Sequence, residues 1–307
     1  MRAFIFPGQG SQAVGMGQLL AEASREARAV FQEVDETLSQ KLSALMIAGP
    51  QEELTLTANA QPAIMANAIA TLRASGVDLA SKANFVAGHS LGEYTALCAA
   101  GSISLATTAR LLKLRGSAMQ EAVPVGEGSM AALVGADIAI AQRIADAAAQ
   151  GDVCTVANDN DPTQVVISGH KSAIDRAIGL AKEHGAKRGI PLPVSAPFHS
   201  PLMRPAADAM EQALADAEIA APVVPLYANV TAAQVEDPDE IRRLLVTQVT
   251  GMVRWRESVL AMHEAGVTHF VEWGAKVLGG MVKRIAPDAR VTSVVTPDDI
   301  DALLGEI

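Results

Sequence analysis

Asn84-Phe-Val-Ala-Gly-His-Ser-Leu-Gly-Glu-Tyr-Thr-Ala-Leu97 is the stretch that decides the fold. Its first part, Phe85 to Ala87, is a short apolar run of the length of a buried strand. Glu93 to Ala100 then has the composition of a helix that starts directly after a turn. The stretch therefore predicts a strand that turns abruptly into a helix.

Ser90 lies at the corner of this turn. Gly88 and Gly92 flank it in a G-x-S-x-G pattern. Because neither glycine has a Cβ, the strand and the helix can pass close together while the serine side chain projects outward. This arrangement is typical of a nucleophilic serine, and the alternative is a serine that only begins a helix.

The composition indicates a large globular protein. The chain has 307 residues, of which 50% are hydrophobic, so it can bury a core of two domains or of one domain with an insertion. Its 24 basic and 34 acidic residues give a net charge of −10. That balance argues against a nucleic-acid partner, since phosphate backbones need a concentrated basic face.

We expect neither a membrane segment nor a metal site. The apolar run at Arg2 to Phe6 ends at Pro7, too soon for a signal peptide, and no segment reaches the length that spans a bilayer. The expected location is therefore the cytoplasm. Cys98 and Cys154 are expected to be small buried apolar side chains without a disulfide. No His, Cys, Asp or Glu group has the spacing of metal ligands.

Strands and helices alternate along most of the chain. Strands are expected at residues 2–6, 85–87, 223–229, 269–272 and 291–295, with helices between them, among them 61–75 and 104–123. This alternation predicts an α/β fold in which a large, α/β-hydrolase-like domain holds a parallel sheet. The large domain is expected to be discontinuous and to comprise residues 1–124 and 196–307.

The rhythm changes in residues 125–195. The expected order is strand 129–134, helix 138–150, strands 153–157 and 164–168, helix 172–184 and strand 188–194, and the polar run Asn158-Asp-Asn-Asp-Pro162 is expected to join the two middle strands. The order β-α-β-β-α-β predicts a small, inserted ferredoxin-like α+β domain. The site is expected in the cleft between the two domains.

A nucleophilic serine needs a base, and His199 is the candidate among six histidines. It lies in the proline-flanked segment Ser195-Ala-Pro-Phe-His-Ser-Pro201, where the small domain returns to the large one. Loops at such places often carry functional residues. The alternative is a histidine that is only hydrogen-bonded within a loop.

Arg115 is predicted to face protein. On the helix expected at 104–123 it lies beside Leu112 and Met119 of the apolar stripe, whereas Lys113 falls on the solvent face. An unpaired buried charge is costly, and a guanidinium suits a carboxylate held by two hydrogen bonds. That carboxylate could belong to a substrate. The alternatives are a structural ion pair with an Asp or Glu, or a side chain that reaches solvent.

Together, these motifs resemble the bacterial malonyl-CoA–acyl carrier protein transacylases of type II fatty acid synthesis. The resemblance covers nearly the whole chain, and its motifs occur in the same order. They are Pro7-Gly-Gln-Gly-Ser-Gln12, Gly88-His-Ser-Leu-Gly-Glu-Tyr94, Arg115-Gly116, Gln164-Val-Val-Ile-Ser-Gly169, Pro197-Phe-His199 and Val277-Leu278.

The resemblance implies a role for each matching residue. Ser90 would be the nucleophile that carries the acyl group, and His199 its base. The backbone N–H groups of Gln9 and Leu91 would form the oxyanion hole. Arg115 would hold the malonyl carboxylate, a contact that an acetyl group could not make.

Two further residues and the partners follow from the same resemblance. Phe198 would crowd the carbon between the two carboxyl groups, which favours malonyl over methylmalonyl. The main-chain carbonyl of Gln248 would orient the histidine in place of a triad carboxylate. The implied partners are malonyl-CoA and acyl carrier protein, the transfer is ping-pong without a cofactor, and a monomer is the default expectation.

One segment departs from the family pattern. The family usually has Gly-Pro-Gly-Lys before its Val-Leu pair, whereas this chain reads Glu272-Trp-Gly-Ala-Lys-Val-Leu278 and is one residue shorter. The geometry of this loop is therefore open.

Two other functions compete with the transferase. An α/β-hydrolase-type esterase shares G-x-S-x-G, but it needs an acidic triad residue and gives Arg115 no reason to face inward. A non-catalytic carrier-docking subunit would not need Ser90 or His199. If a carrier docks, it should meet a local basic patch, for which the candidates are Lys187, Arg188, Lys276, Lys283 and Arg284; the alternative is ordinary surface charge.

Overall fold

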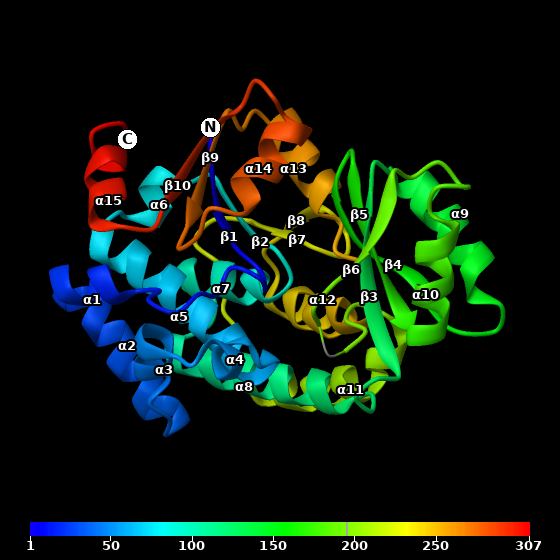
Figure 1. Ribbon diagram of the computed structural model, residues 1–307. Coiled ribbons are helices and arrows are strands. Elements are labelled where there is room, and N and C mark those ends of the chain that lie inside the picture. Colours follow the sequence, from blue (N-terminus) through cyan, green and yellow to red (C-terminus); the bar gives the residue numbers. More distant parts are fainter. Residues whose placement is uncertain (195) are drawn as a thin grey trace.

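The computed structural model describes residues 1–194 and 196–307, and Ser195 lies outside the described residues. Figure 1 shows two sheets with helices around them. The larger sheet has the order β10-β9-β1-β2-β7-β8, with every neighbouring pair parallel except the antiparallel β7 and β8. The smaller sheet is antiparallel, with the order β4-β5-β3-β6. The predicted fold class is confirmed.

The larger sheet is formed by six short strands. They are β1 Arg2–Phe6, β2 Phe85–Gly88, β7 Leu226–Ala228, β8 Ala233–Val235, β9 His269–Trp273 and β10 Arg290–Val294. The smaller sheet is formed by β3 Gly128–Val134, β4 Cys154–Asp161, β5 Gln164–His170 and β6 Arg188–Pro191. We propose residues 125–195 as the inserted domain; its proposed C-terminal limit falls on Ser195, outside the described residues.

Helices surround both sheets. The first half of the chain forms α1 Gln18–Ala23, α2 Arg25–Leu38, α3 Leu42–Ala48, α4 Gln51–Thr55, α5 Thr57–Ser75, α6 Leu79–Lys82, α7 Leu91–Ala99, α8 Leu105–Glu121 and α9 Ile138–Ala149. The second half forms α10 Lys171–Leu180, the short 3-10 helix η1 Pro201–Met203, α11 Arg204–Asp216, α12 Pro238–Thr250, α13 Trp255–Glu264, α14 Leu278–Ile285 and α15 Pro297–Leu304. No helix among the described residues has the length and hydropathy needed to cross a membrane.

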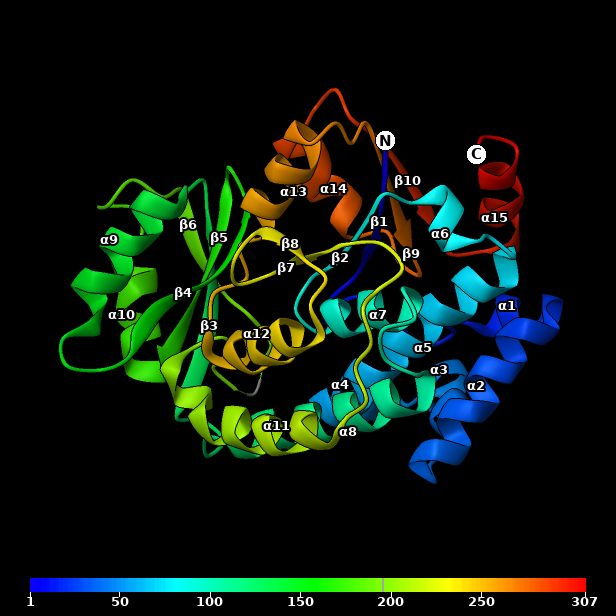
Figure 2. The same ribbon diagram turned by 180° about the vertical axis from the view of Figure 1, so that it is seen from behind.

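Strand β1 shows how the larger sheet is buried on both faces. Phe4 and Phe6 belong to the large core that includes α5 and α7, whereas Ala3 and Ile5 belong to the core under α13 and α14. Alternate side chains of a strand point to opposite faces, so one apolar run supplies both layers. Seen from behind in Figure 2, α13 and α14 lie on one side of the sheet and α5 and α7 on the other.

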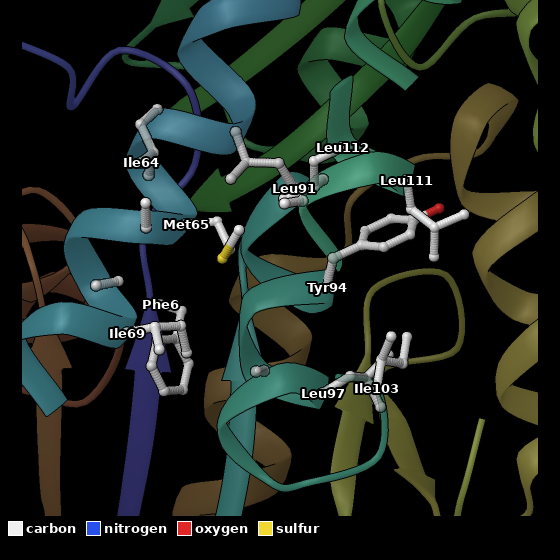
Figure 3. Packing of buried hydrophobic residues seen from close by; sticks show 14 of the residues in the cluster. Phe6, Ile64, Met65, Ile69, Leu91, Tyr94, Leu97, Ile103, Leu111 and Leu112 are labelled. Atoms are coloured by element: carbon white, nitrogen blue, oxygen red, sulfur yellow. The ribbon is translucent and has the colours of Figure 1, made fainter. Parts of the chain in front are cut away.

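Helix α7 is buried on nearly all of its faces, and this burial fixes the position of Ser90, the residue that precedes it. Figure 3 shows Leu91 and Tyr94 of α7 close to the α8 residues Leu111 and Leu112, while Met65 of α5 lies on its other side. All five are within one core cluster. Since protein interiors are packed as densely as crystals, this helix has little freedom to shift.

Several elements differ from the sequence-based expectation, among them the unexpected short helices α4 and α6 and the short strand β8. Helix α5 starts at Thr57, four residues early, and holds Pro62 in its first turns. Helices α11 and α15 were not expected. The expected turn at Asn158–Pro162 is wrong, because β4 continues to Asp161 with two irregularities in its pairing.

The polar run in β4 is strand because the other domain supplies its partners. Asp159 pairs with Arg256 of α13 at 2.8 Å, and Asp161 pairs with Arg284 of α14 at 2.9 Å. The Asp159 N–H also donates to the Val253 carbonyl at 2.9 Å. Both aspartates are fully buried, so these contacts hold β4 against the large domain.

Removing the Asp159 carboxylate should destabilise this junction. Burial raises the pKa of Asp159 even beside Arg256. Removing this carboxylate leaves the Arg256 guanidinium without its partner. We expect Asp159→Ala to lower the free energy of unfolding by about 3 kcal/mol, measured by urea unfolding. The control is Asp208→Ala, which breaks the exposed pair with Arg204 and should cost less than about 1 kcal/mol. Equal effects of the two variants would contradict the assignment.

Candidate active site

Ser90 occupies a strained corner between β2 and α7. Its backbone has φ 54° and ψ −110°, a conformation that few non-glycine residues adopt. A Cβ on Gly88 would lie 1.9 Å from the backbone of Gly92, and one on Gly92 would lie 2.3 Å from the Phe6 carbonyl oxygen. The two glycines are therefore required for the close approach of strand and helix, as the G-x-S-x-G pattern predicted.

His199 lies next to the serine. Its Nε2 is 2.7 Å from Ser90 Oγ, although the two residues are 109 positions apart. Its Nδ1 is 2.9 Å from the Gln248 carbonyl oxygen and 3.1 Å from that of Gly251. Because carbonyls only accept, Nδ1 carries the proton and donates, which leaves Nε2 free to accept the Ser90 hydroxyl proton.

Burial keeps the His199 ring neutral. Burial, with a smaller contribution from the charge of Arg115, lowers the pKa of His199 to about 3. The ring is 4% exposed and its backbone has φ 55°, so both position and charge are constrained by the surrounding chain. A neutral imidazole is the form that can accept a proton from serine.

Arg115 is buried, at 1% exposure, and points at the serine. Its Nη1 donates to Gln61 Oε1 at 2.9 Å, and its Nη2 donates to Gln248 Oε1 at 2.9 Å and to Ser90 Oγ at 3.1 Å. Among the described residues, no carboxylate lies within ion-pair distance of this guanidinium. The structural ion pair considered as an alternative does not form there, and burial lowers the pKa of Arg115.

The sequence analysis missed Gln61, the partner of Arg115, and it also missed Asn229 and Glu93. Asn229, at the end of β7, accepts the Ser90 N–H with Oδ1 at 2.8 Å and donates to the Gly88 carbonyl with Nδ2 at 2.7 Å. Glu93 accepts from the Asn229 N–H and from Gln248 Nε2. The available signal was a single acid inside the otherwise uncharged run Leu91 to Ala100.

A cavity of about 380 Å³ opens in front of Ser90. Gln9, Leu91 and Phe198 line it beside the larger sheet, and Met130 and Asn158 line it from the smaller sheet, so it lies between the two sheets. Neither the Gln9 nor the Leu91 N–H donates to any described residue. A larger hollow of about 630 Å³ lies elsewhere, near Arg73 and Cys98, and holds neither Ser90 nor His199.

The shortened loop before α14 is closed by Glu272. Its carboxylate accepts the N–H groups of Val277 and Leu278 at 2.8 Å and that of Gly279 at 3.0 Å, which caps the helix. Gly274 has φ +85°, and a Cβ there would lie 2.7 Å from the Ala68 backbone. The missing residue is thus accommodated by a tight glycine turn away from Ser90.

The hydrogen bonds of His199 also bear on the esterase alternative. In an acidic triad a carboxylate binds Nδ1, whereas here two main-chain carbonyls do so.

Within residues 1–194 and 196–307, no cluster of His, Cys, Asp and Glu could hold a metal ion. Cys98 and Cys154 are free thiols, as expected.

Comparisons with known proteins show the family of the chain. The family model "Acyl transferase domain" matches residues 3–278. The malonyl CoA-acyl carrier protein transacylase of Bacillus subtilis (strain 168) is 44% identical over 304 residues, which cover 97% of this chain and 95% of that protein. The transacylase of the same name from Escherichia coli (strain K12) is 43% identical, with 98% of each chain covered.

Solved structures give the same result. The acyl-carrier-protein-S-malonyltransferase from Bartonella henselae superposes with a TM-score of 0.97 at 52% identity, over 99% of this chain and 98% of that one. A malonyl-transacylase in complex with its type II PKS acyl-carrier protein gives 0.95 at 40% identity, over 100% and 99%. With such similarity along its whole length, the chain belongs to the malonyl CoA-acyl carrier protein transacylase family of acyl transferases.

Proposed function

We propose that this enzyme moves malonyl from malonyl-CoA to the phosphopantetheine thiol of acyl carrier protein and so supplies fatty acid elongation. The observation that carries the proposal is the convergence of Ser90, His199 and Arg115 on one cavity. A hydroxyl, a base and a buried cation within hydrogen-bond reach of one another suit an acyl donor that ends in a carboxylate.

The first half-reaction acylates Ser90. His199 Nε2 accepts the hydroxyl proton while Ser90 Oγ attacks the thioester carbonyl carbon, and the carbonyl oxygen becomes an oxyanion. The unused N–H groups of Gln9 and Leu91 stabilise that charge. The carbon–sulfur bond then breaks, CoA leaves with the proton from His199, and malonyl remains on Ser90.

The second half-reaction returns the enzyme to its starting state. The carrier thiol gives its proton to His199 Nε2, and its sulfur attacks the malonyl-serine carbonyl. The Ser90 oxygen leaves and takes the proton back. The main-chain carbonyls that hold His199 Nδ1 keep the ring in one tautomer through both steps, which is the role of the carboxylate in a hydrolase triad.

Donor choice belongs to the far end of the cavity. Arg115 exchanges its contact with Ser90 Oγ for the malonyl carboxylate while it keeps those with Gln61 and Gln248, and a two-pronged pair with that carboxylate is stronger than the neutral contact it replaces. Phe198 lines the same cavity and limits the space beside the carbon between the carboxyl groups. An acetyl donor has no carboxylate that could pair with the guanidinium.

Trapping the acyl-serine tests the proposal. Mass spectrometry of the enzyme mixed with malonyl-CoA and no carrier should show a single malonyl adduct that maps to Ser90. Ser90→Ala should bind the carrier and show no adduct. Steady release of free malonate without a thiol acceptor would instead favour an esterase, and an unmodified Ser90 in active enzyme would exclude the mechanism.

The five candidate basic residues for carrier docking differ in their contacts. Of the five candidate basic residues, Lys276 pairs with Asp299 at 3.3 Å, Arg284 pairs with Asp161, and Lys283 donates to the Ala289 carbonyl at 2.7 Å. Lys187 and Arg188 are exposed at the start of β6, and we propose these two as the carrier contacts that deserve charge reversal first. A rise in the KM for the carrier in Lys187→Glu with Arg188→Glu would support this choice.

We also propose that the enzyme works as a monomer in the cytoplasm. Ser90, His199 and Arg115 all come from one chain, so the site does not need a second copy. Cys98 and Cys154 remain thiols, as is usual for proteins of a reducing compartment.

A further inference from the structure

Glu93 is a buried carboxylate that the transfer mechanism does not use. It is the third residue of α7, three positions after Ser90 in the sequence, and its side chain is 1% exposed. Its Oε2 accepts the Asn229 N–H at 2.9 Å and Gln248 Nε2 at 3.0 Å. Burying an acid in this way is costly, since burial raises the pKa of Glu93 to about 7.

Gln248 connects this carboxylate to the other residues of the site. Its Nε2 also donates to the Ser90 carbonyl at 3.0 Å, and its Oε1 accepts from Arg115 Nη2 at 2.9 Å. Its main-chain carbonyl holds His199. One residue of α12 therefore contacts the nucleophile, the base and the carboxylate-binding arginine.

The orientation of the Gln248 amide matters for Arg115. If the amide turned over, its NH₂ group would face the guanidinium, and two donors would oppose each other. Its oxygen would then face Glu93 Oε2, and two acceptors would oppose each other. Nε2 faces two acceptors, the neutral Ser90 carbonyl and the Glu93 carboxylate. An ionised carboxylate binds donors more strongly than a neutral group does, so Glu93 is the stronger of the two in opposing the turned-over amide.

We propose that Glu93 is a positioning residue for malonyl selectivity: through the Gln248 amide it holds Arg115 where the malonyl carboxylate arrives. This inference rests on the proposed function. Acetyl transfer needs Ser90 and His199 but no carboxylate contact, so losing Glu93 should harm malonyl transfer more than acetyl transfer. A residue that only supported the fold would harm both donors equally.

The test compares acylation rates of Ser90 with malonyl-CoA and acetyl-CoA. In Glu93→Ala and in Glu93→Met, which refills the emptied volume, the malonyl-to-acetyl ratio of kcat/KM should fall about tenfold, the effect of losing one well-placed hydrogen bond in a buried site. Glu93→Gln should recover only part of the ratio, because its neutral amide oxygen can accept both hydrogen bonds but accepts them less strongly than a carboxylate does. The matched control is Glu26→Ala, which removes an exposed acid in the first turn of α2 and should leave the malonyl-to-acetyl ratio unchanged.

A second set of variants asks whether Glu93 acts through Gln248. Gln248→Met keeps the main-chain carbonyl but cannot accept from Arg115, so it should lower the ratio by itself. The double variant that combines Gln248→Met with Glu93→Met should therefore have the same ratio as Gln248→Met alone. Fully additive effects, or an unchanged ratio in folded Glu93→Met, would overturn the inference. If wild-type enzyme forms no malonyl-serine, it is the proposed function that fails.

The pH dependence gives an independent readout. Of Glu93, His199 and Tyr94 at the site, it is Glu93 that titrates between pH 6 and 8, because the pKa of His199 lies near 3 and burial raises that of Tyr94. Among the described residues, Arg115 of α8 and Tyr94 of α7 are the charged or titratable groups that act on it. As pH falls through 7, Glu93 is protonated and accepts less strongly, so the wild-type ratio should fall. In Glu93→Gln it should stay constant, and a wild-type-like fall in that variant would contradict the inference.

Discussion

His199→Ala is expected to slow acylation of Ser90 by malonyl-CoA by about 10³-fold, the usual contribution of a positioned base. Without Nε2 at 2.7 Å, no described side chain other than Arg115 lies within hydrogen-bond distance of Ser90 Oγ, and a guanidinium cannot accept a proton. The measurement is the rate of CoA release in the first turnover, followed with a thiol reagent.

The control for this prediction is another histidine. His184 follows α10 in the small domain, far along the chain from the site, and His184→Ala should keep the wild-type rate. The fold of His199→Ala is checked by its thermal unfolding, which should stay cooperative with a modestly lower midpoint temperature, because the variant leaves the Gln248 and Gly251 carbonyls without their donor. A rate within tenfold of wild type in folded protein would mean that another group removes the serine proton.

The elbow and its arginine could be predicted because both depend on local patterns. The apolar run before Gly88 and the spacing of Gly88, Ser90 and Gly92 follow from the geometry of a strand that meets a helix. The inward side of Arg115 follows from helical periodicity over α8. In both cases the determining residues lie within a few positions of one another.

The rest of the site depends on contacts that no local pattern encodes. Asn229 meets Ser90 across 139 positions, and Gln248 meets Glu93 across 155. The run from Asn158 to Asp161 looked like a turn because it is polar, yet it is strand because arginines of α13 and α14 neutralise it. Propensity was overridden there by tertiary ion pairs, which is why β4 was predicted too short.

Arg115→Ala is expected to reverse the donor preference. Malonyl-CoA would lose its carboxylate contact, and kcat/KM for this donor should fall by about 10²-fold or more. Acetyl-CoA makes no such contact in the wild type, where it leaves the buried guanidinium without a carboxylate or water. The variant has no guanidinium, so the rate with acetyl-CoA should be kept or should rise. The assay is single-turnover acylation of Ser90 with each donor in parallel.

Variants of the same helix separate charge from geometry in this prediction. Arg115→Lys keeps the charge but not the planar fork, so it should recover part of the malonyl rate and remain below wild type. Arg110→Ala removes an exposed arginine of α8 and should change neither donor. Because Arg115 Nη2 also donates to Ser90 Oγ, any effect of its removal on the nucleophile itself is the same for both donors. Only the difference between the donors measures carboxylate recognition, and an equal loss of malonyl and acetyl transfer would assign Arg115 to the serine instead of the substrate.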